Sequence, residues 1–311
     1  MKTGLFIAAI TLCALLALVA WLWTPDKPRA DLERDYLASP ADMITVAGTR
    51  LHVRDTGPRG APAAPVVVLL HGFGSSLHTW EPWALALAAG HRVIRFDLPG
   101  SGLSAPDATG DYTDARSLQL LTALLDQLGV PQASVVGHSI GGRIAWKFAA
   151  ASPGRVRKLV LIAPDGFASP GFAYGQAPEV PAVMGLMRYA LPKPLLRMNL
   201  APAYAQPDRL LDATLTRYHD LMLAPGSRDA LLARLRQTVL DDPLPMLRRI
   251  RAPTLLLWGE RDQMIPFANA ADYAGAITNA RVVAVPDAGH VPFEELPQAS
   301  LVPVLAFLDA P

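Results

Sequence analysis

The sequence predicts an α/β fold in which a mostly parallel sheet is covered by helices on both faces. Short apolar runs rich in β-branched residues recur along the chain, and segments with helical periodicity separate them. Runs that are apolar throughout indicate strands buried on both sides, which are typical of parallel sheets. Because 51% of the 311 residues are hydrophobic and only 18% are charged, the chain can bury a substantial core.

The expected strands share a short apolar sequence bounded by glycine, proline or polar residues. They are residues 66–70, 93–96, 134–136, 158–162, 254–258 and 281–285. A helix is expected between the second and third of these strands, because leucines recur there at helical spacing until Gly129 and Pro131 end it. These leucines are Leu118, Leu121, Leu125 and Leu128.

The alternation of strands and helices stops between residues 166 and 250. This stretch is rich in methionine and proline, contains a helical segment at residues 229–240 and has no convincing strand. We therefore expect a helical cap here, inserted between two parts of the core at residues 41–165 and 251–311. Methionines in such a segment more often fill an adaptable core than form a recognition surface, although in a cap above an active site they can do both.

Charge and cysteine content exclude several classes of protein. The formal net charge is +1 and no Lys/Arg-rich block is present, so we expect no nucleic-acid partner. The single cysteine, Cys13, excludes an intramolecular disulfide and a thiolate metal cluster. No metal-ligand pattern such as His-Glu-x-x-His occurs, and we expect neither a metal nor a cofactor.

The amino-terminal region, residues 1–24, predicts a membrane anchor or a signal peptide. Residues 5–23 carry no charge and match the ~20 residues with which a helix crosses a bilayer. Leu18 stands where a signal-peptide cleavage site needs a small residue, and Trp21 and Trp23 suit a membrane interface. We therefore expect a single amino-terminal transmembrane helix, with a secreted or periplasmic protein after signal cleavage as the alternative.

Cationic residues flank this apolar run on both sides. Lys2 precedes it, and the cations that follow are Lys27, Arg29 and Arg34. Their distribution leaves the side of the membrane open. Residues 25–40 are polar and contain prolines, so we expect a linker between the anchor and the globular part.

The segment from Gly137 to Gly141 has the Gly-x-Ser-x-Gly pattern of a nucleophile elbow, a sharp turn between a strand and a helix. A predicted strand precedes it, and the helix-compatible residues 144–150 follow it. Glycines are needed at both positions because side chains there would collide with the neighbouring strand and helix. Ser139, at the centre of the turn, is the candidate nucleophile.

A serine hydroxyl becomes a strong nucleophile only when a base takes its proton. His290 is the best-placed base, since it follows the strand at residues 281–285 at the edge where carboxyl ends of parallel strands meet. Asp262 follows its own strand and can hold the imidazole in the right tautomer. Asp165, after the strand at residues 158–162, remains an alternative acid.

Five segments of the chain together resemble the α/β-hydrolase fold superfamily, over essentially all residues after Pro40. They are His-Gly-Phe-Gly at 71–74, Asp-Leu-Pro-Gly-Ser-Gly-Leu-Ser at 97–104, Gly-His-Ser-Ile-Gly-Gly at 137–142, Trp-Gly-Glu-Arg-Asp at 258–262 and Gly-His at 289–290. The order Ser, Asp, His is also that of the family triad. The sequence is most similar to the capped esterases and lipases, and its amino-terminal run adds a similarity to membrane-bound monoacylglycerol-lipase-type hydrolases.

The resemblance implies an oxyanion hole formed by the backbone N–H groups of Phe73 and Ile140. Two such donors stabilise the developing alkoxide, each by about 10²–10³ in rate. Gly72 and Gly74 would let the backbone approach, and the Phe73 phenyl group would line the acyl pocket.

The function expected from these residues is hydrolysis of carboxylic esters through an acyl-enzyme on Ser139. An apolar cap and a membrane anchor favour hydrophobic or lipid esters as substrates. One alternative is a carbon–carbon bond hydrolase of aromatic breakdown that uses the same triad. Another is a binding protein of the same fold without catalysis. The expected partners are a small-molecule ester and a membrane contacted through residues 5–23.

Other polar residues near these motifs have structural interpretations. We expect His71 and His138 to bond the backbone around the loop and the elbow, and Asp97 to hold the turn that follows it. Gly72-x-Gly74 after a strand also imitates a dinucleotide-binding loop, but Leu77 takes the place of the third glycine. That interpretation leaves Ser139 unexplained.

Overall fold

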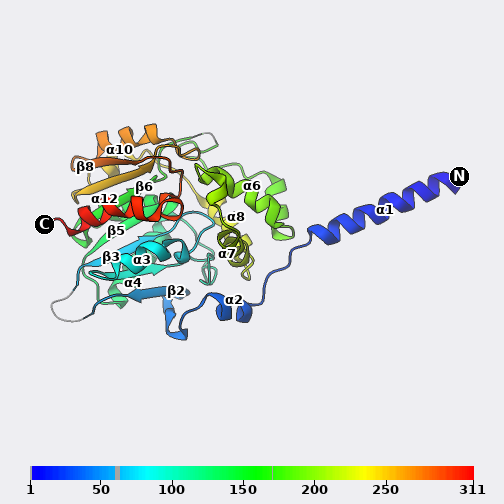
Figure 1. The fold of residues 1–311 in the computed structure, drawn as a ribbon, viewed down its shortest axis with the longest axis horizontal. Helices are drawn as coiled ribbons and strands as arrows, with labels where there is room; N and C mark the ends of the chain where they lie inside the picture. Colours follow the sequence, from blue (N-terminus) through cyan, green and yellow to red (C-terminus); the bar gives the residue numbers. More distant parts are fainter. Residues whose placement is uncertain (1, 60–63, 170) are drawn as a thin grey trace.

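The computed structural model of the protein describes residues 2–59, 64–169 and 171–311, without the side chains of residues 2–5 and 8. Figure 1 shows a long amino-terminal helix that projects from a globular part, and a carboxyl terminus at the opposite end of the molecule. Within the globular part, helices α6, α7 and α8 of the cap lie on the side from which the long helix projects.

The core contains an eight-stranded sheet in the order β1-β2-β4-β3-β5-β6-β7-β8. Strand β2 pairs antiparallel with both β1 and β4, and all other neighbours are parallel. The strands are β1 (Met43–Val46), β2 (Thr49–Thr56), β3 (Val66–Leu70), β4 (Arg92–Phe96), β5 (Ala133–His138), β6 (Val156–Ile162), β7 (Thr254–Gly259) and β8 (Ala280–Val285). The expected mostly parallel sheet is thereby confirmed.

Strands β1 and β2 are not among the strands expected from the sequence. They form a hairpin whose turn residues, Ala47 and Gly48, both have positive φ, as a tight two-residue turn requires. Strand β2 carries polar residues on buried positions, among them Thr49 and His52. These side chains have partners elsewhere in the fold, so the strand lacks the uniform apolar character of the other strands.

Helices cover both faces of the sheet because neighbouring residues of each strand point to opposite sides. In β3, Val68 and Leu70 belong to one buried hydrophobic cluster with residues of α4, α5, α9 and α10, whereas Val67 and Leu69 belong to a second cluster with residues of α3 and α12. The core helices are α3 (Glu81–Leu87), α4 (Asp114–Gln127), α5 (Ile140–Ala151), α9 (Leu244–Leu247), α10 (Ala270–Ala276), α11 (Pro292–Glu295) and α12 (Pro297–Asp309).

The region expected as a cap is helical and contains only isolated β-bridges among its described residues. Its elements are η4 (Ala182–Arg188), α6 (Lys193–Leu200), η5 (Ala201–Ala203), η6 (Pro207–Arg209), α7 (Asp212–Met222) and α8 (Ser227–Gln237). Helix α9, which falls within residues 166–250, instead packs with the core through the fully buried Leu247. Because α9 packs with the core, the cap ends before α9.

Residues 25–40 differ from the expected linker. They contain α2 (Arg29–Tyr36), whose Leu32 is buried against Leu103 and Leu221. The Tyr36 hydroxyl donates to Asp220 Oδ2 at 3.0 Å, and Lys27 forms an ion pair with the same carboxylate at 2.7 Å. This segment is thus packed onto the core and the cap, because Leu32, an apolar residue in an otherwise polar helix, is buried between them.

Helix α1 (Lys2–Leu22) has 21 residues, and its carboxyl end meets the cap. Trp23 stacks on Tyr189 with ring centroids 5.8 Å apart, and the Thr24 N–H donates to the Tyr189 carbonyl. The side chains of Leu5 and Ala8, within the predicted span 5–23, lie outside the described residues. Among the residues that are described, no helix is both long and apolar enough to cross a membrane.

Candidate active site

Ser139 lies in a strained turn between β5 and α5. Its φ of 54° and ψ of −121° are rare for a residue with a side chain, and such strain is typical of a nucleophile elbow. A Cβ atom at Gly137 would lie 2.3 Å from the Gly141 carbonyl oxygen, and one at Gly141 would lie 2.4 Å from the Leu70 carbonyl oxygen. Both glycines are therefore required by the close approach of neighbouring backbones.

His290 and Asp262 lie together at the carboxyl edge of the sheet. Asp262 Oδ2 accepts from His290 Nδ1 at 2.8 Å, and both side chains are buried. The other oxygen, Oδ1, accepts from the backbone N–H groups of Met264 and Ile265 at 2.8 and 2.9 Å. Because Asp262 accepts the hydrogen bond of Nδ1–H, the proton stays on Nδ1 and the Nε2 lone pair of His290 is available as a base.

The elbow and the histidine loop are joined through His138. Its Nε2–H donates to the His290 backbone carbonyl at 2.9 Å, and the two imidazole rings lie 4.5 Å apart. Burial and the neighbouring His290 hold the pKa of His138 well below its ordinary value, so the ring is a neutral structural donor. The residue next to Ser139 thus supports the loop of the candidate base.

The Ser139 hydroxyl is half-buried, and no hydrogen bond to it of 3.5 Å or less occurs among the residues described. Its carbonyl oxygen accepts from the N–H groups of Arg143 and Asp165. Catalytic serine–histidine hydrogen bonds often shorten only when a substrate is in place. The structure therefore brings Ser139, His290 and Asp262 to one edge of the sheet, with the Asp–His hydrogen bond already formed.

The expected oxyanion donors lie on either side of the serine. Ile140 is the first residue of α5, where backbone N–H groups have no partner inside the helix and carry the positive end of its dipole. A Cβ atom at Gly72 would lie 3.3 Å from Ser139 Cβ, so the loop holding Phe73 passes next to the nucleophile. In the described part of the chain, the N–H groups of Phe73 and Ile140 have no protein acceptor.

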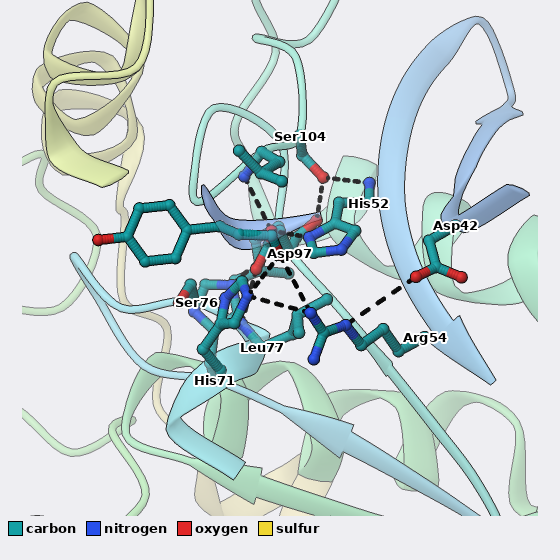
Figure 2. A network of polar contacts seen from close by, with 12 residues as sticks. Asp42, His52, Arg54, His71, Ser76, Leu77, Asp97 and Ser104 are labelled. Atoms are coloured by element: carbon teal, nitrogen blue, oxygen red, sulfur yellow. Dashed lines mark hydrogen bonds and ion pairs between the residues drawn. The ribbon is translucent and has the colours of Figure 1, made fainter. Parts of the chain in front are cut away.

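Asp97 holds the backbone next to the loop after β3, here called the oxyanion loop (residues 71–76), which carries Phe73 (Figure 2). Its Oδ1 accepts from the Leu77 N–H at 2.6 Å, and its Oδ2 accepts from the Leu103 N–H at 2.9 Å and from His52 Nδ1 at 2.8 Å. Asp97 is completely buried at the end of β4. It therefore ties the loop after β3 to the turn after β4, which agrees with its expected role.

The charge of Asp97 is stabilised inside the fold. Burial by itself would raise its pKa, but the attraction of His52 and its hydrogen bond to the carboxylate are the main effects that outweigh burial. The result lowers the pKa from 3.8 to about 2. Asp97 is therefore a carboxylate throughout the neutral range.

His71 has a structural role next to this network (Figure 2). Its Nδ1–H donates to the Gly72 carbonyl at 2.8 Å, and its Nε2 accepts from the Leu98 N–H at 2.9 Å. Burial lowers the pKa of His71, so the ring is neutral and can use Nε2 as an acceptor. A protonated ring would present an N–H to another N–H at that position.

Asp165, the alternative acid, has a different partner. Its Oδ2 accepts from Arg143 Nη1 at 2.5 Å, and Arg143 also bonds Asp114 on α4. Since Asp262 is the carboxylate that holds His290 Nδ1, Asp165 is not placed as the triad acid. It belongs to an ion-pair network with Arg143 and Asp114 that no sequence pattern indicates.

Two surface pockets flank these loops. One is lined by Gly74 and Ser75 of the oxyanion loop, by the turn at Gly100–Gly102 and by cap residues that include Met222. The other is lined by Asp165 and Phe167 after β6 and by residues that follow Asp262, such as Met264. Neither pocket includes Ser139, but each adjoins a loop of the candidate site.

Fold and site together define an α/β hydrolase, an enzyme class in which a nucleophile elbow faces a histidine held by an acid. The sequence profile of the alpha/beta hydrolase fold matches residues 65–297, and the chain belongs to this family.

The names of similar proteins refer to several different activities. The dihydrolipoyllysine-residue acetyltransferase component of the acetoin cleaving system of Cupriavidus necator is 32% identical over 272 residues, covering 86% of this chain and 68% of the relative. A 2-hydroxy-6-oxononadienedioate/2-hydroxy-6-oxononatrienedioate hydrolase of Pseudomonas putida is 31% identical, covering 78% of this chain and 85% of the relative. The crystal structure of a membrane phospholipase A, described as a bacterial virulence factor, is 25% identical with a TM-score of 0.73. That match covers 99% of this chain and 98% of the other.

Substituting Asp97 should make stability less dependent on acid pH. A carboxylate whose pKa is lower in the folded state stabilises the fold above its ordinary pKa of 3.8, and this stabilisation is lost as the pH falls towards about 2. The shift corresponds to about 2 kcal/mol. In urea unfolding from about pH 6 to about pH 3, the stability difference between wild type and Asp97→Asn should shrink. A difference that stays constant over this range would contradict the assignment.

The elbow should not tolerate a methyl group at Gly141. Because the added Cβ would lie 2.4 Å from the Leu70 carbonyl oxygen, Gly141→Ala must displace β3 or α5. We expect a loss of roughly 1–3 kcal/mol, measured as a lower midpoint of thermal or urea unfolding. Gly154→Ala is the matched control, since a Cβ there meets nothing within 4 Å. Equal midpoints for the two variants would show that close approach does not dictate the glycine.

Proposed function

We propose that this protein is a serine hydrolase that cleaves carboxylic esters through an acyl-enzyme on Ser139. The observation that carries the proposal is one arrangement at the carboxyl edge of the sheet. Ser139 occupies a strained elbow at the start of α5, while His290 lies nearby with its Nδ1 held by Asp262 at 2.8 Å. The strained backbone of Ser139 and the burial of the Asp262–His290 pair both cost folding free energy. That cost favours a catalytic role over a binding-only one.

In the first half of the proposed reaction, Ser139 Oγ attacks the ester carbonyl carbon while His290 Nε2 takes the hydroxyl proton. Asp262 stabilises the imidazolium through Nδ1. The carbonyl oxygen becomes an alkoxide, which accepts hydrogen bonds from the N–H groups of Phe73 and Ile140. The imidazolium then protonates the leaving alcohol as the C–O bond breaks, and the acyl group stays on Ser139.

In the second half, water attacks the acyl carbon and gives a proton to His290 Nε2. The same two backbone N–H groups hold the second alkoxide. Collapse of this intermediate releases the carboxylic acid, and His290 returns the proton to Ser139 Oγ. The cycle uses only groups of the protein and water.

The substrate class that we propose is a hydrophobic or lipid ester. The cap displays several large apolar side chains on its surface, and exposed apolar clusters commonly mark interaction sites. They include Val183, Leu186, Tyr189 and Met198. The likeness to a structure described as a membrane phospholipase A supports the same class.

A second candidate function is hydrolysis of a carbon–carbon bond. The observation that favours it is the 31% identity to a relative named as a 2-hydroxy-6-oxononadienedioate/2-hydroxy-6-oxononatrienedioate hydrolase. The same serine, histidine and aspartate can serve either reaction, so the fold does not separate them. The separation has to come from substrates.

Ser139→Ala should abolish labelling by a fluorophosphonate probe and lower ester hydrolysis by roughly 10⁴-fold or more, because the nucleophile is lost. Turnover of p-nitrophenyl esters by wild type should rise with acyl chain length. The matched control is Ser152→Ala, which removes a hydroxyl at the opposite end of α5 and should retain full labelling.

Wild type that is not labelled would refute the serine hydrolase. Labelling without ester turnover, combined with turnover of a 2-hydroxy-6-oxo-dienoate, would favour the carbon–carbon hydrolase. Loss of labelling in Ser152→Ala would show that the serine variants act through misfolding.

We also propose that residues 5–23 attach the protein to a membrane, where hydrophobic esters concentrate. The described side chains of α1 in this range are mostly exposed and apolar; Leu16 and Trp21, for example, are 60% and 70% exposed. Trp23, which follows α1, stacks on Tyr189 and forms a β-bridge with Ala190 of the cap. An apolar helix without a protein partner gains free energy when lipid covers it.

Leu16→Asp should weaken attachment to phosphatidylcholine vesicles, because a charge in the centre of the apolar run is costly in lipid. Leu85→Asp, which alters another exposed leucine on the core helix α3, is the matched control and should float with vesicles as wild type does. Equal flotation of the two variants would refute the attachment. A mature protein whose first residue lies beyond Trp23 would refute a retained anchor.

A further inference from the structure

Two adjacent buried carboxylates, Glu294 and Glu295, have no role in the proposed reaction. They end the short helix α11, four and five residues after His290 in the chain. Their side chains reach the cap in different ways, and only one of them contacts the loop that carries the histidine. This difference makes the pair informative about how that loop is held.

Glu295 is bonded by backbone N–H groups from both the histidine loop and the cap. Its Oε2 accepts from Gly289 at 2.7 Å and from Ala205 at 3.1 Å, and its Oε1 accepts from Gln206 at 2.8 Å. The residue is only 5% exposed, and no cation forms an ion pair with it among the described residues. All observed donors to this carboxylate are therefore backbone amides whose positions it dictates.

The cap also contacts the histidine loop directly. The N–H of His290 donates to the Ala203 carbonyl at 2.7 Å. A Cβ atom at Gly289 would lie 2.5 Å from the Ala203 carbonyl oxygen and 2.6 Å from the Ala205 nitrogen, so the two backbones are in close contact. The segment after η5 and the loop of His290 thus form one packed unit, and the Glu295 carboxylate lies between them.

We propose that Glu295 is a positioning residue that places His290 for catalysis by tying its loop to cap residues 203–206. This inference rests on the proposed function, because it assigns His290 as the base. It makes the cap part of what orients the base, in addition to covering the site. Misplacement of a catalytic group by about 1 Å can cost roughly 100-fold in rate, so a backbone tie of this kind has a measurable effect.

Glu294 provides the comparison within the same helix. Its oxygens accept from side chains: Thr79 Oγ1 at 2.7 Å, Tyr204 OH at 2.7 Å and Tyr218 OH at 3.1 Å. Arg217 also forms an ion pair with it. Glu294 therefore docks the cap onto η2 (Leu77–Trp80), and among the described residues its carboxylate has only side-chain partners.

Replacing Glu295 by glutamine should weaken the connection between the histidine loop and the cap whichever way the amide is turned. One side of a glutamine is an NH₂ donor, and every contact made by the carboxylate is to an N–H donor. Either the Gly289 and Ala205 bonds or the Gln206 bond must be lost. Glu294→Gln removes the same charge but retains donors and acceptors that hydroxyl partners can satisfy.

The test compares Glu295→Gln and Glu294→Gln with an exposed cap control, Glu179→Gln. With a p-nitrophenyl ester, Glu295→Gln should lower kcat by roughly 10- to 100-fold at nearly unchanged KM. Glu294→Gln should act mainly on KM, because it loosens the cap, and Glu179→Gln should match wild type. The downfield NMR signal of the proton between His290 Nδ1 and Asp262 should shift or broaden in Glu295→Gln alone.

Gly289→Ala is an independent second variant, since its methyl group would press Ala203 and Ala205 away while Glu295 stays intact. It should reproduce the loss in kcat and the change in the NMR signal, measured below the unfolding midpoint of each variant. It also serves as the test if Glu295→Gln does not fold.

The inference is overturned if the variants altered at 295 and 289 keep a wild-type kcat and NMR signal. It is also overturned if Glu294→Gln changes kcat and the signal equally, because general cap docking would then explain both. Failure of the proposed function has a different signature: wild type itself would not react with a fluorophosphonate or an ester. The NMR signal needs no substrate, so the two failures can be told apart.

Discussion

The strained turn at Ser139 is the constraint on which the rest of the structure depends. The backbone of Ser139, a residue with a side chain, is held at φ 54° because β5 and α5 meet with almost no space between them. Gly137 and Gly141 make that approach possible, and the same approach brings the amino end of α5 beside the loop after β3. The nucleophile, the helix dipole and both candidate oxyanion donors therefore follow from one close contact between backbones.

Around this turn, the loops are held mainly by buried polar side chains bonded to backbone. Asp97 holds the turns after β3 and β4, His71 joins the same two turns, and His138 holds the carbonyl of His290. Two of these groups are neutral histidines, because burial lowers the pKa of His71 and His138. Such groups fix loop geometry without adding a competing base near Ser139.

The cap takes part in this arrangement. Its residues after η5 bond the backbone of the histidine loop, and Glu295 lies buried between the two. In an enzyme whose cap only covered the site, the cap could vary freely with the substrate. Here hydrogen bonds of 2.7–3.1 Å connect the cap to the loop of the candidate base, so the proposed role of Glu295 links substrate recognition to catalysis.

The sequence by itself determined the parallel strands, the elbow and the order of Ser139, Asp262 and His290, because these depend on local apolar runs, glycine requirements and positions after strands. It could not predict β2, whose polar residues are satisfied by distant partners, or the packing of Leu32, which makes α2 part of the globular unit. Only the tertiary structure decided that Asp165 pairs with Arg143 while Asp262 holds His290, and that Glu295 joins cap to loop. Those choices depend on which groups long-range folding brings within hydrogen-bond distance, and spacing along the chain carries no record of that.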